Sequence, residues 1–397
     1  MSEWKEYKLG DLISIKGGFS YKGEYIGTGD KFLLGMGCVS YSKTFLQSGA
    51  RPYSGDCFDR FYAKPFDIVL ATRQQSDNLP ILGLPAIIPQ SFWGEKVIVG
   101  TNLYKVDNYS EVDNKYLYWL MRSPNYINYI HSCSKGSTVK MITKDAVESF
   151  VFMCPPKEER DFISGLLWQI EDKIDLLNRQ NQTLESMAEA LFRHYFIDNA
   201  QPEWEEKSLF DCIELIGGGT PKTTIDEYWN GSIKWLSCGD IANNHKGFIF
   251  DAEKSISEIG LNSSSTKLLP KYATVISARG TVGKFCILSE PMAFSQSNYG
   301  ILPQYKDCFF FTYLLVSYSV EELQSAAYGS VFDTITTNTF KGLSVSLPSK
   351  ELILQFETMI TVYFSKIYNN QSQINTLCSL RDTLLPKLMN REIDLKN

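Results

Sequence analysis

The sequence lacks paired cysteine motifs, clustered histidines and long apolar runs, and each absence excludes a class of protein. Only three histidines occur in 397 residues (His131, His194 and His245), so we expect neither catalysis nor metal binding based on histidine. The nine cysteines are an odd number and no two are spaced as Cys-x-x-Cys, which predicts reduced thiols rather than a disulfide framework or a zinc site. The longest apolar runs, such as residues 309–316, are well short of the roughly 20 residues that cross a bilayer. Because residues 1–6 also contain no apolar leader, we expect a soluble protein of the cytoplasm.

Apolar content and length indicate a multidomain globular protein. Hydrophobic residues make up 44% of the chain and aromatic residues 13%, which is enough to build real cores and excludes a disordered chain. At about 150 residues per domain, the length favours two to three domains. The net charge of −6 argues against a polybasic coat but is compatible with a local basic groove.

Motifs of the first half recur in the same order in the second half. Glu3-Trp4-Lys5-Glu6 returns as Glu203-Trp204-Glu205-Glu206, and Gly17-Gly18 returns as Gly217-Gly218, both at an offset of 200. Residues 67–73 correspond to 273–279, and the landmarks around residues 136, 142 and 155 return at an offset of 193. Ordered matches of this kind are hard to obtain by chance, so the chain is a tandem duplication.

Each half begins with about 150 residues that read as a mixed α/β domain. Short β-branched and aromatic runs at 67–70, 96–99, 274–277 and 343–347 predict strands, and residues 114–122 and 309–317 predict helices. A long helix follows in each half, because apolar residues step alternately by four and three over more than four heptads. These residues form an apolar stripe, or seam, along one side of each helix. The seam of the first helix consists of Ile163, Leu167, Ile170, Ile174, Leu177, Leu184 and Leu191. The seam of the second helix consists of Phe356, Ile360, Tyr363, Ile367, Ile374, Leu377 and Leu384.

We expect the two long helices to pair with each other, the competing interpretation being that each packs only on its own domain. Connectivity makes such a pair antiparallel, because the first helix leads into the second domain and the second helix must run back. Three polar residues, Asn181, Asn370 and Arg381, interrupt the apolar seams and would fix the register of the pair. Ala188, Tyr195 and Leu388 continue the seams. Pro386 should end or kink the second helix.

Sequence motifs for catalysis are missing. The stretch Gly217-Gly218-Gly219-Thr220-Pro221 resembles a phosphate-binding loop, but Pro221 replaces the glycine before Lys222, so a glycine-rich turn after a strand is the better interpretation. Cys154-Pro155-Pro156 lacks the flanking residues of an amino-methyltransferase loop and suits the start of a helix. Neither a metal-dependent nuclease pattern nor a Gly-x-Ser-x-Gly motif is found.

This duplicated arrangement resembles the specificity (S) subunit of type I restriction-modification systems over essentially the whole chain. The residues that carry the resemblance are Trp4 with Gly17-Gly18, Trp204 with Gly217 to Pro221, the segments from Pro155 and Pro348 that precede the helices, and the two seams. The first half departs from the Gly-x-Thr-Pro motif, because Phe19-Ser20-Tyr21 stand there.

The resemblance implies an α/β (α+β) fold with two tandem target recognition domains, separated by two long antiparallel coiled-coil helices with pseudo-twofold symmetry. We expect domains at 1–156 and 200–349, spacer helices at 157–199 and 350–391, and a tail at 392–397. It further implies that each domain reads half of a bipartite double-stranded DNA site, and that the helix pair sets the spacing and docks two methyltransferase (M) subunits and, through them, restriction (R) subunits. Catalysis, with its S-adenosylmethionine, ATP and Mg²⁺, would belong to those partners, and no metal or cofactor is expected in this chain.

Polar residues that follow strands or repeat between the halves are the candidates for DNA contact. Arginine suits phosphate or guanine, amides suit adenine, and small hydroxyl residues allow close approach to phosphate. The competing interpretations are an arginine paired with an acidic neighbour and ordinary turns. The candidates are Arg73, Gln74, Gln75, Lys135, Ser137, Thr138, Lys140, Lys222, Arg279, Thr281, Lys284 and Ser330.

Three other functions remain open at this point. The first is a coiled-coil adaptor whose duplicated domains bind protein or glycan partners. The second is a stand-alone nuclease with an unrecognised active site, and the third is a specificity subunit from a related phage-defence system. Salt-sensitive binding to duplex DNA separates the first from the others.

Overall fold

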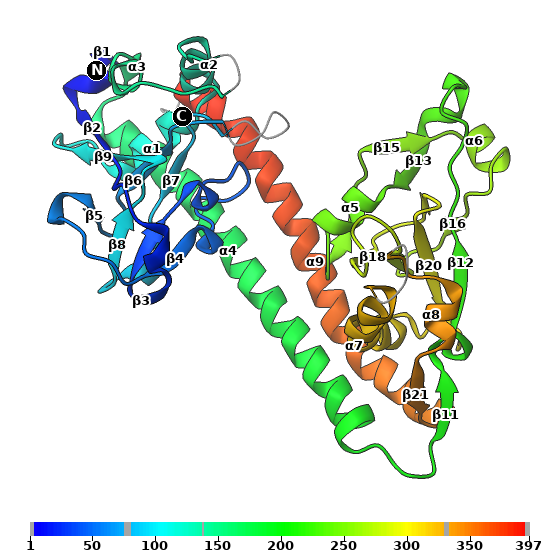
Figure 1. Cartoon of the computed structure of the whole chain (residues 1–397). Helices are drawn as coiled ribbons and strands as arrows, with labels where there is room; N and C mark the ends of the chain where they lie inside the picture. The colour runs from blue at the N-terminus through cyan, green and yellow to red at the C-terminus, as the bar shows by residue number, and fades with distance from the viewer. Residues whose placement is uncertain (1–3, 75–80, 137–138, 329–332, 394–397) are drawn as a thin grey trace. The chain divides into compact units, whose positions relative to one another are not determined.

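The computed structural model describes residues 4–74, 81–136, 139–328 and 333–393 (Figure 1). It divides into two compact units. Unit 1 comprises Met1–Asp175 and Thr376–Asn397, and unit 2 comprises Leu176–Asn375. Each unit therefore contains the strands of one repeat and a segment of each long helix. No helix in the described ranges is long and apolar enough to span a membrane.

Unit 1 contains two four-stranded sheets and a two-stranded ribbon. Their strand orders are β2-β9-β6-β7, β4-β3-β8-β5 and β1-β10. Polar residues cap the first two helices of this unit. The side chain of Asp113 accepts a hydrogen bond from Lys115 N at the start of α1. Ser123 caps α2, whose first residue is Pro124. The elements are β1 (Lys5–Lys8), β2 (Ile13–Gly17), β3 (Ile26–Leu34), β4 (Ala50–Tyr53), β5 (Tyr62–Ala63), β6 (Ile68–Ala71), β7 (Pro85–Ile87), β8 (Lys96–Val99), β9 (Leu103–Asn108), β10 (Val151–Cys154), α1 (Asn114–Arg122), α2 (Pro124–Ser132) and α3 (Lys144–Glu148).

Unit 2 has sheets of order β12-β20-β17-β18-β14 and β15-β13-β19-β16, and a ribbon of β11 and β21. The helix predicted at 309–317 continues to Tyr328 in the structure. The strand predicted at 274–277 is confirmed as β17, and the strand predicted at 96–99 is confirmed as β8 of unit 1. The elements are β11 (Glu205–Ser208), β12 (Ile213–Gly217), β13 (Trp229–Leu236), β14 (Phe248–Ile249), β15 (Lys254–Ile256), β16 (Leu268–Leu269), β17 (Thr274–Ser277), β18 (Phe285–Leu288), β19 (Met292–Phe294), β20 (Asn298–Pro303), β21 (Ser344–Leu347), α5 (Cys238–Asn243), α6 (Glu258–Asn262), α7 (Phe309–Tyr328) and α8 (Thr337–Lys341).

The two units repeat one topology. The order β2-β9-β6-β7 corresponds to β12-β20-β17-β18, and unit 2 adds β14 at the edge. A parallel pair lies inside the second sheet of each unit, β3 with β8 in unit 1 and β13 with β19 in unit 2. The tandem duplication read from the sequence is therefore a duplication of the fold.

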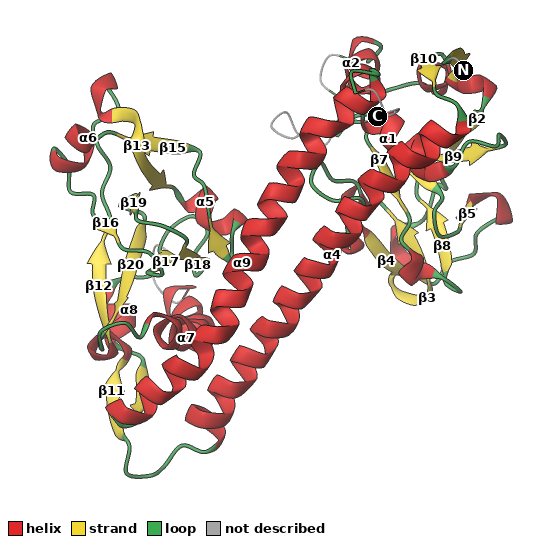
Figure 2. Cartoon of the chain, turned by 180° about the vertical axis from the view of Figure 1, so that it is seen from behind, coloured by secondary structure: helices red, strands yellow, loops and turns green. Residues whose placement is uncertain are grey.

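The long helices α4 (Lys157–Arg193) and α9 (Lys350–Met389) pack against each other in both units (Figure 2). In unit 1 the beginning of α4 meets the end of α9, because Ile163 and Leu167 share one apolar core with Leu385 and Leu388. In unit 2 the relation is reversed, since Ala188 near the end of α4 shares a core with residues near the start of α9, such as Phe356 and Ile360. Within each unit the helices are therefore antiparallel.

The seam of α4 changes its spacing near its end. Tyr195, which the heptad pattern places in the seam, is 38% exposed, whereas Phe192 and Phe196 are buried. The rings of all three residues contact the ring of Phe356, and a π-helical turn, His194–Asp198, follows α4. Tyr195 therefore contacts a seam residue of α9 as the heptad pattern predicts, but Phe192 and Phe196, which the pattern leaves out, hold the buried positions.

Of the two effects predicted for Pro386, an end of the helix is wrong, since α9 continues to Met389. The last turn keeps its hydrogen bonds beyond the proline, with Asn390 N donating to Pro386 O at 3.0 Å. Leu385, Leu388 and Met389 are buried in the core of unit 1. Burial of these side chains offsets the single hydrogen bond that the proline removes.

A buried polar pair crosses the helix seam in each unit. In unit 1 Arg381 Nη1 donates to Glu171 Oε1 at 2.6 Å, and both side chains are almost fully buried. Burial raises the pKa of Glu171, and the guanidinium of Arg381 opposes this shift. In unit 2 Asn370 Nδ2 donates to Asn181 Oδ1 at 2.9 Å. Because a buried polar group is costly without its partner, these pairs favour one register.

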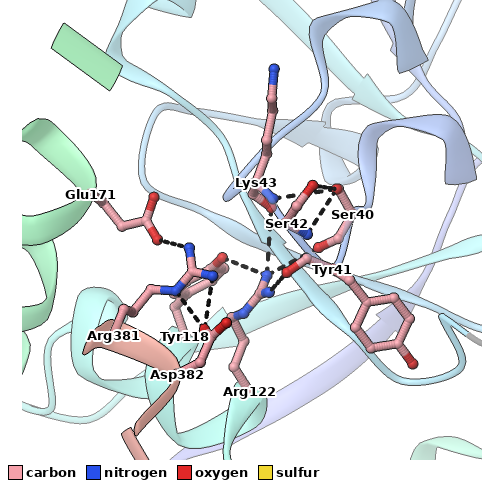
Figure 3. A network of polar contacts seen from close by, with 9 residues as sticks. All are labelled: Ser40, Tyr41, Ser42, Lys43, Tyr118, Arg122, Glu171, Arg381 and Asp382. Atoms are coloured by element: carbon pink, nitrogen blue, oxygen red, sulfur yellow. Dashed lines mark hydrogen bonds and ion pairs between the residues drawn. The ribbon is translucent and has the colours of Figure 1, made fainter. Parts of the chain in front are cut away.

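The Glu171–Arg381 pair belongs to a larger network in unit 1 (Figure 3). Arg381 also contacts the carboxylate of Asp382 at 2.8 Å. Arg122 on α1 donates to the hydroxyl of Tyr118 at 2.9 Å and to the carbonyl of Ser40 at 3.0 Å. Tyr118 interacts electrostatically with Glu171 and Arg381, so the polar pair of the helices lies beside the contacts of α1 with the loop that follows β3.

In unit 2 a carboxylate of α9 holds the start of α7. Glu357 accepts hydrogen bonds from the backbone N–H groups of Phe310 at 3.1 Å and Phe311 at 2.7 Å. Burial raises the pKa of Glu357 to about 7. Since the first N–H groups of a helix have no partner within the helix, this side chain supplies one and ties α9 to the domain.

Replacing Arg381 by alanine should destabilise the protein strongly, because the carboxylate of Glu171 would stay buried without its partner. Breaking a buried pair in this way costs about 3–5 kcal/mol. The double variant Glu171→Leu/Arg381→Leu should recover most of that loss, and the exposed control Lys173→Ala should change little. Urea denaturation measures all three. Equal stability of the wild type and Arg381→Ala would show that the pair does not hold the helices.

Candidate nucleic-acid interface

Three segments of unit 1 meet where β6 ends. The backbone N–H and the hydroxyl of Thr72 both donate to the carbonyl of Asn102, at 3.2 and 2.9 Å. The carbonyl of Thr72 in turn accepts from Ile142 N at 3.1 Å. Thr72 therefore fixes the segments around residues 102 and 142 beside the end of the strand.

Four of the residues predicted in unit 1 come together at this strand end. Arg73 forms an antiparallel bridge with Met141, and Gln74 N donates to the carbonyl of Lys140 at 3.0 Å. Lys135 and Met141 exchange two backbone hydrogen bonds of 2.9 and 2.8 Å. The side chains of Lys135 and Lys140 are exposed, and that of Arg73 is half-buried. Gln75, Ser137 and Thr138 lie outside the described residues.

Unit 2 repeats this junction at the end of β17. Ala278 takes the place of Thr72, because its N–H donates to Ser297 O at 2.9 Å and its carbonyl accepts from Ile335 N at 3.1 Å. Arg279 follows and is exposed. The equivalence of Arg73 and Arg279 in the sequence is thus matched by equivalent backbone contacts.

In the turn after Arg279, the hydroxyl of Thr281 forms hydrogen bonds within unit 2. Thr281 Oγ1 is 3.2 Å from the carbonyl of Cys238 and 3.0 Å from the hydroxyl of Ser277. Its hydroxyl is therefore occupied, whereas the side chain of Lys284 is half-buried. Ser330 lies outside the described residues. In the parts of the chain that the structure covers, neither Arg73 nor Arg279 forms an ion pair with an acidic residue.

The repeated glycine pairs mark a close crossing of backbones. A Cβ atom on Gly18 would lie 2.0 Å from Gly100 O, and one on Gly218 would lie 2.1 Å from Ser295 O. Only glycine fits such an approach. Gly219 N donates to Phe294 O at 3.0 Å, so the stretch that resembles a phosphate loop continues into a turn. Lys222 in that turn has an exposed side chain, while its carbonyl accepts from Trp229 Nε1 at 3.2 Å.

Burial shifts the pKa values of three cysteines and one histidine away from their usual range. Burial raises the pKa of Cys38 to about 12 and those of Cys212 and Cys308 to about 11, so these thiols stay protonated. His245 Nδ1 accepts from Phe285 N at 3.3 Å, and burial lowers the pKa of His245. Within the described ranges no group of three or more His, Cys, Asp or Glu side chains could hold a metal ion.

Sequence reasoning did not single out Arg51, Thr101 and Asn102, which lie beside the junction of unit 1. Arg51 pairs with Leu33 across β3 and β4, as Lys254 pairs with Trp235 across β13 and β15. Insertions change the offset between the halves around these positions, which hides the correspondence in the sequence. A basic residue within a short strand was the only available signal.

The comparisons with known proteins give a family match, similar curated proteins and a similar solved structure. The family described as type I restriction modification DNA specificity domain matches residues 1–186 and 201–376. The specificity subunit of the type I restriction enzyme HindI from Haemophilus influenzae is 25% identical over 99% of this chain and 100% of that protein. The MjaIX specificity subunit from Methanocaldococcus jannaschii is 22% identical over 98% of this chain and 94% of that protein. The crystal structure of a type I restriction-modification S subunit from M. genitalium has a TM-score of 0.59, with 15% identity over 99% of this chain and 97% of that one, and shows the fold.

Removing the two exposed lysines of the unit 1 junction should weaken binding to duplex DNA. In Lys135→Ala/Lys140→Ala the slope of log affinity against log salt should decrease in magnitude by roughly two, because each phosphate contact contributes about one. Fluorescence anisotropy over a salt series measures the slope. Because both side chains are exposed, the variant should fold. Lys173→Ala, on the exposed face of α4, is the matched control, and an unchanged slope in the double variant would contradict the assignment.

Proposed function

We propose, from the premise that the chain belongs to the family of type I restriction-modification DNA specificity domains, that it is the sequence-recognition subunit of such a complex. Each repeated domain reads one half of a bipartite, asymmetric DNA target. The chain itself is not catalytic, and partner methyltransferase (M) and restriction (R) subunits carry out adenine methylation and ATP-dependent cleavage. Those partners bind the S-adenosylmethionine, ATP and Mg²⁺ that the reactions need.

The observation that carries this proposal is the repeated junction with unlike side chains. Thr72 and Ala278 make the same backbone contacts, yet Gln74 follows Arg73 where Gly280 follows Arg279. Base readout depends on the side chains that reach the groove, whereas the scaffold only positions them. A duplicated scaffold with different polar residues is what two unlike half-sites require.

The long helices are proposed to set the spacing between the half-sites and to dock the M subunits. Helices of 37 and 40 residues span roughly 55–60 Å. This length exceeds one turn of duplex DNA, about 34–36 Å. We propose that the two recognition domains are residues 1–156 and 200–349, and that the spacer helices are residues 157–199 and 350–391.

Sequencing the modified adenines in DNA from cells that express this chain with its M partner tests the proposal. The expected motif is bipartite, with two unlike halves separated by a fixed number of unspecified base pairs. A continuous palindrome, or no sequence preference, would contradict the proposal. Cells with the M partner alone are the control.

Deleting one heptad from both long helices should shorten the spacing between the half-sites. Removal of residues 174–180 and 372–378 keeps both polar pairs, Glu171 with Arg381 and Asn181 with Asn370. The helices become shorter by about 10 Å, or roughly three base pairs. Deleting 174–180 alone should abolish activity, because the polar pairs no longer align. A double deletion that modifies the original motif would show that the helices are not the ruler.

A further inference from the structure

Beside the junction of unit 1 lies a hollow of about 260 Å³. Its wall includes the polar side chains of Tyr21, Arg51, Thr101 and Asn102, together with Gly35 and Gly37. Arg51 is exposed on β4, and its Nη2 atom lies 3.9 Å from the place where a Cβ on Gly35 would stand. The guanidinium group therefore lies at the edge of the hollow.

Two polar side chains at the hollow are not used by the fold. The carbonyl of Asn102 holds Thr72, but within the described ranges its side-chain amide and the guanidinium of Arg51 have no hydrogen-bond or ion-pair partner. Arginine reads guanine and asparagine reads adenine through paired donors and acceptors in the major groove. These side chains are thus of the kind that reads bases and are free to do so.

The glycines of the wall fall into two groups. A Cβ on Gly49 would lie 1.9 Å from Cys38 N and one on Gly100 would lie 2.4 Å from Leu34 O, so the fold requires both. A Cβ on Gly35 or Gly37 would have its nearest neighbour at 3.9 or 3.5 Å, which is ordinary contact. The backbone of Gly35, with φ of −115°, suits any residue. Gly35 and Gly37 therefore keep the hollow open without being needed for packing.

The same three positions in unit 2 carry different side chains. The strand registers align Arg51 with Lys254, because Leu33 and Trp235 are their partners. The junction contacts align Asn102 with Ser297, so Thr101 corresponds to Gln296. Arg51, Thr101 and Asn102 thus correspond to Lys254, Gln296 and Ser297 on a common scaffold.

We propose that Arg51, Thr101 and Asn102 determine the base specificity of the half-site read by unit 1, with the hollow receiving the edge of a base pair. Lys254, Gln296 and Ser297 have this role for the other half-site. The proposal rests on the function proposed above and assigns its sequence readout to particular residues. Arg73, Lys135 and Lys140, around the neighbouring strand end, would contact the phosphates and position the duplex.

The test uses the complete methyltransferase complex with Arg51→Ala, Asn102→Ala and Lys254→Ala, and maps modified adenines. Arg51→Ala and Asn102→Ala should relax base preference in one half of the motif and leave the other half intact. Lys254→Ala should do the reverse. Binding to the wild-type target should fall about tenfold or more for each, as for the loss of a bidentate base contact.

Gly35→Ala/Gly37→Ala gives an independent test, because it narrows the hollow without removing a polar group. It should lower affinity for the same half-site and leave the thermal unfolding midpoint unchanged. Lys96→Ala is the matched control, since Lys96 begins β8 and Thr101 and Asn102 follow the other end of that strand.

The outcomes separate this proposal from the general one. An unchanged motif in both Arg51→Ala and Asn102→Ala overturns the assignment, even when the wild-type motif is bipartite. Equal weakening at both half-sites also overturns it, because that pattern indicates phosphate contact or loss of structure. A wild-type complex without a bipartite motif contradicts the proposed function itself.

Discussion

The antiparallel pairing of α4 and α9 is the constraint on which the rest of the structure depends. Each helix belongs to both units, and each unit contains its own segment of the pair, with Glu171 bonded to Arg381 in unit 1 and Asn181 to Asn370 in unit 2. Apolar burial along the seam supplies the stabilisation, while the polar pairs penalise every other register. The cores of both units include helix residues, so domain folding and helix pairing are linked.

The two units repeat one backbone scaffold, and the exposed side chains on this scaffold differ between the units. Gly18 and Gly218 allow the same backbone crossing, and Thr72 and Ala278 make the same junction. Around these fixed points the exposed side chains differ, from Arg51 in one unit to Lys254 in the other. Under the proposed function, this separation of the scaffold from the side chains it carries lets specificity change without cost to the fold.

Much of the architecture could be predicted from the sequence because it depends on local patterns. Strands such as β8 and β17 are apolar runs, and the duplication shows itself in repeated motifs. Tertiary packing decides the rest, as at Phe192 and Phe196, which the heptad pattern leaves out of the seam but which are buried against the ring of Phe356 beside Tyr195. Arg51 and Asn102 were missed because strand pairing and a backbone contact, neither visible in a single sequence, bring them to one place.

The central claim is tested most directly by measuring distances across the helix pair. Spin labels introduced by non-cysteine chemistry at Asp172 with Thr383, and at Gln182 with Asn369, report one distance in each unit by pulsed electron resonance. Antiparallel packing predicts that both distances are short, below about 25 Å, since packed helix axes lie about 8–10 Å apart. A parallel pair would make one of them longer by roughly 35 Å, and separated helices would lengthen both. Either result would contradict the account.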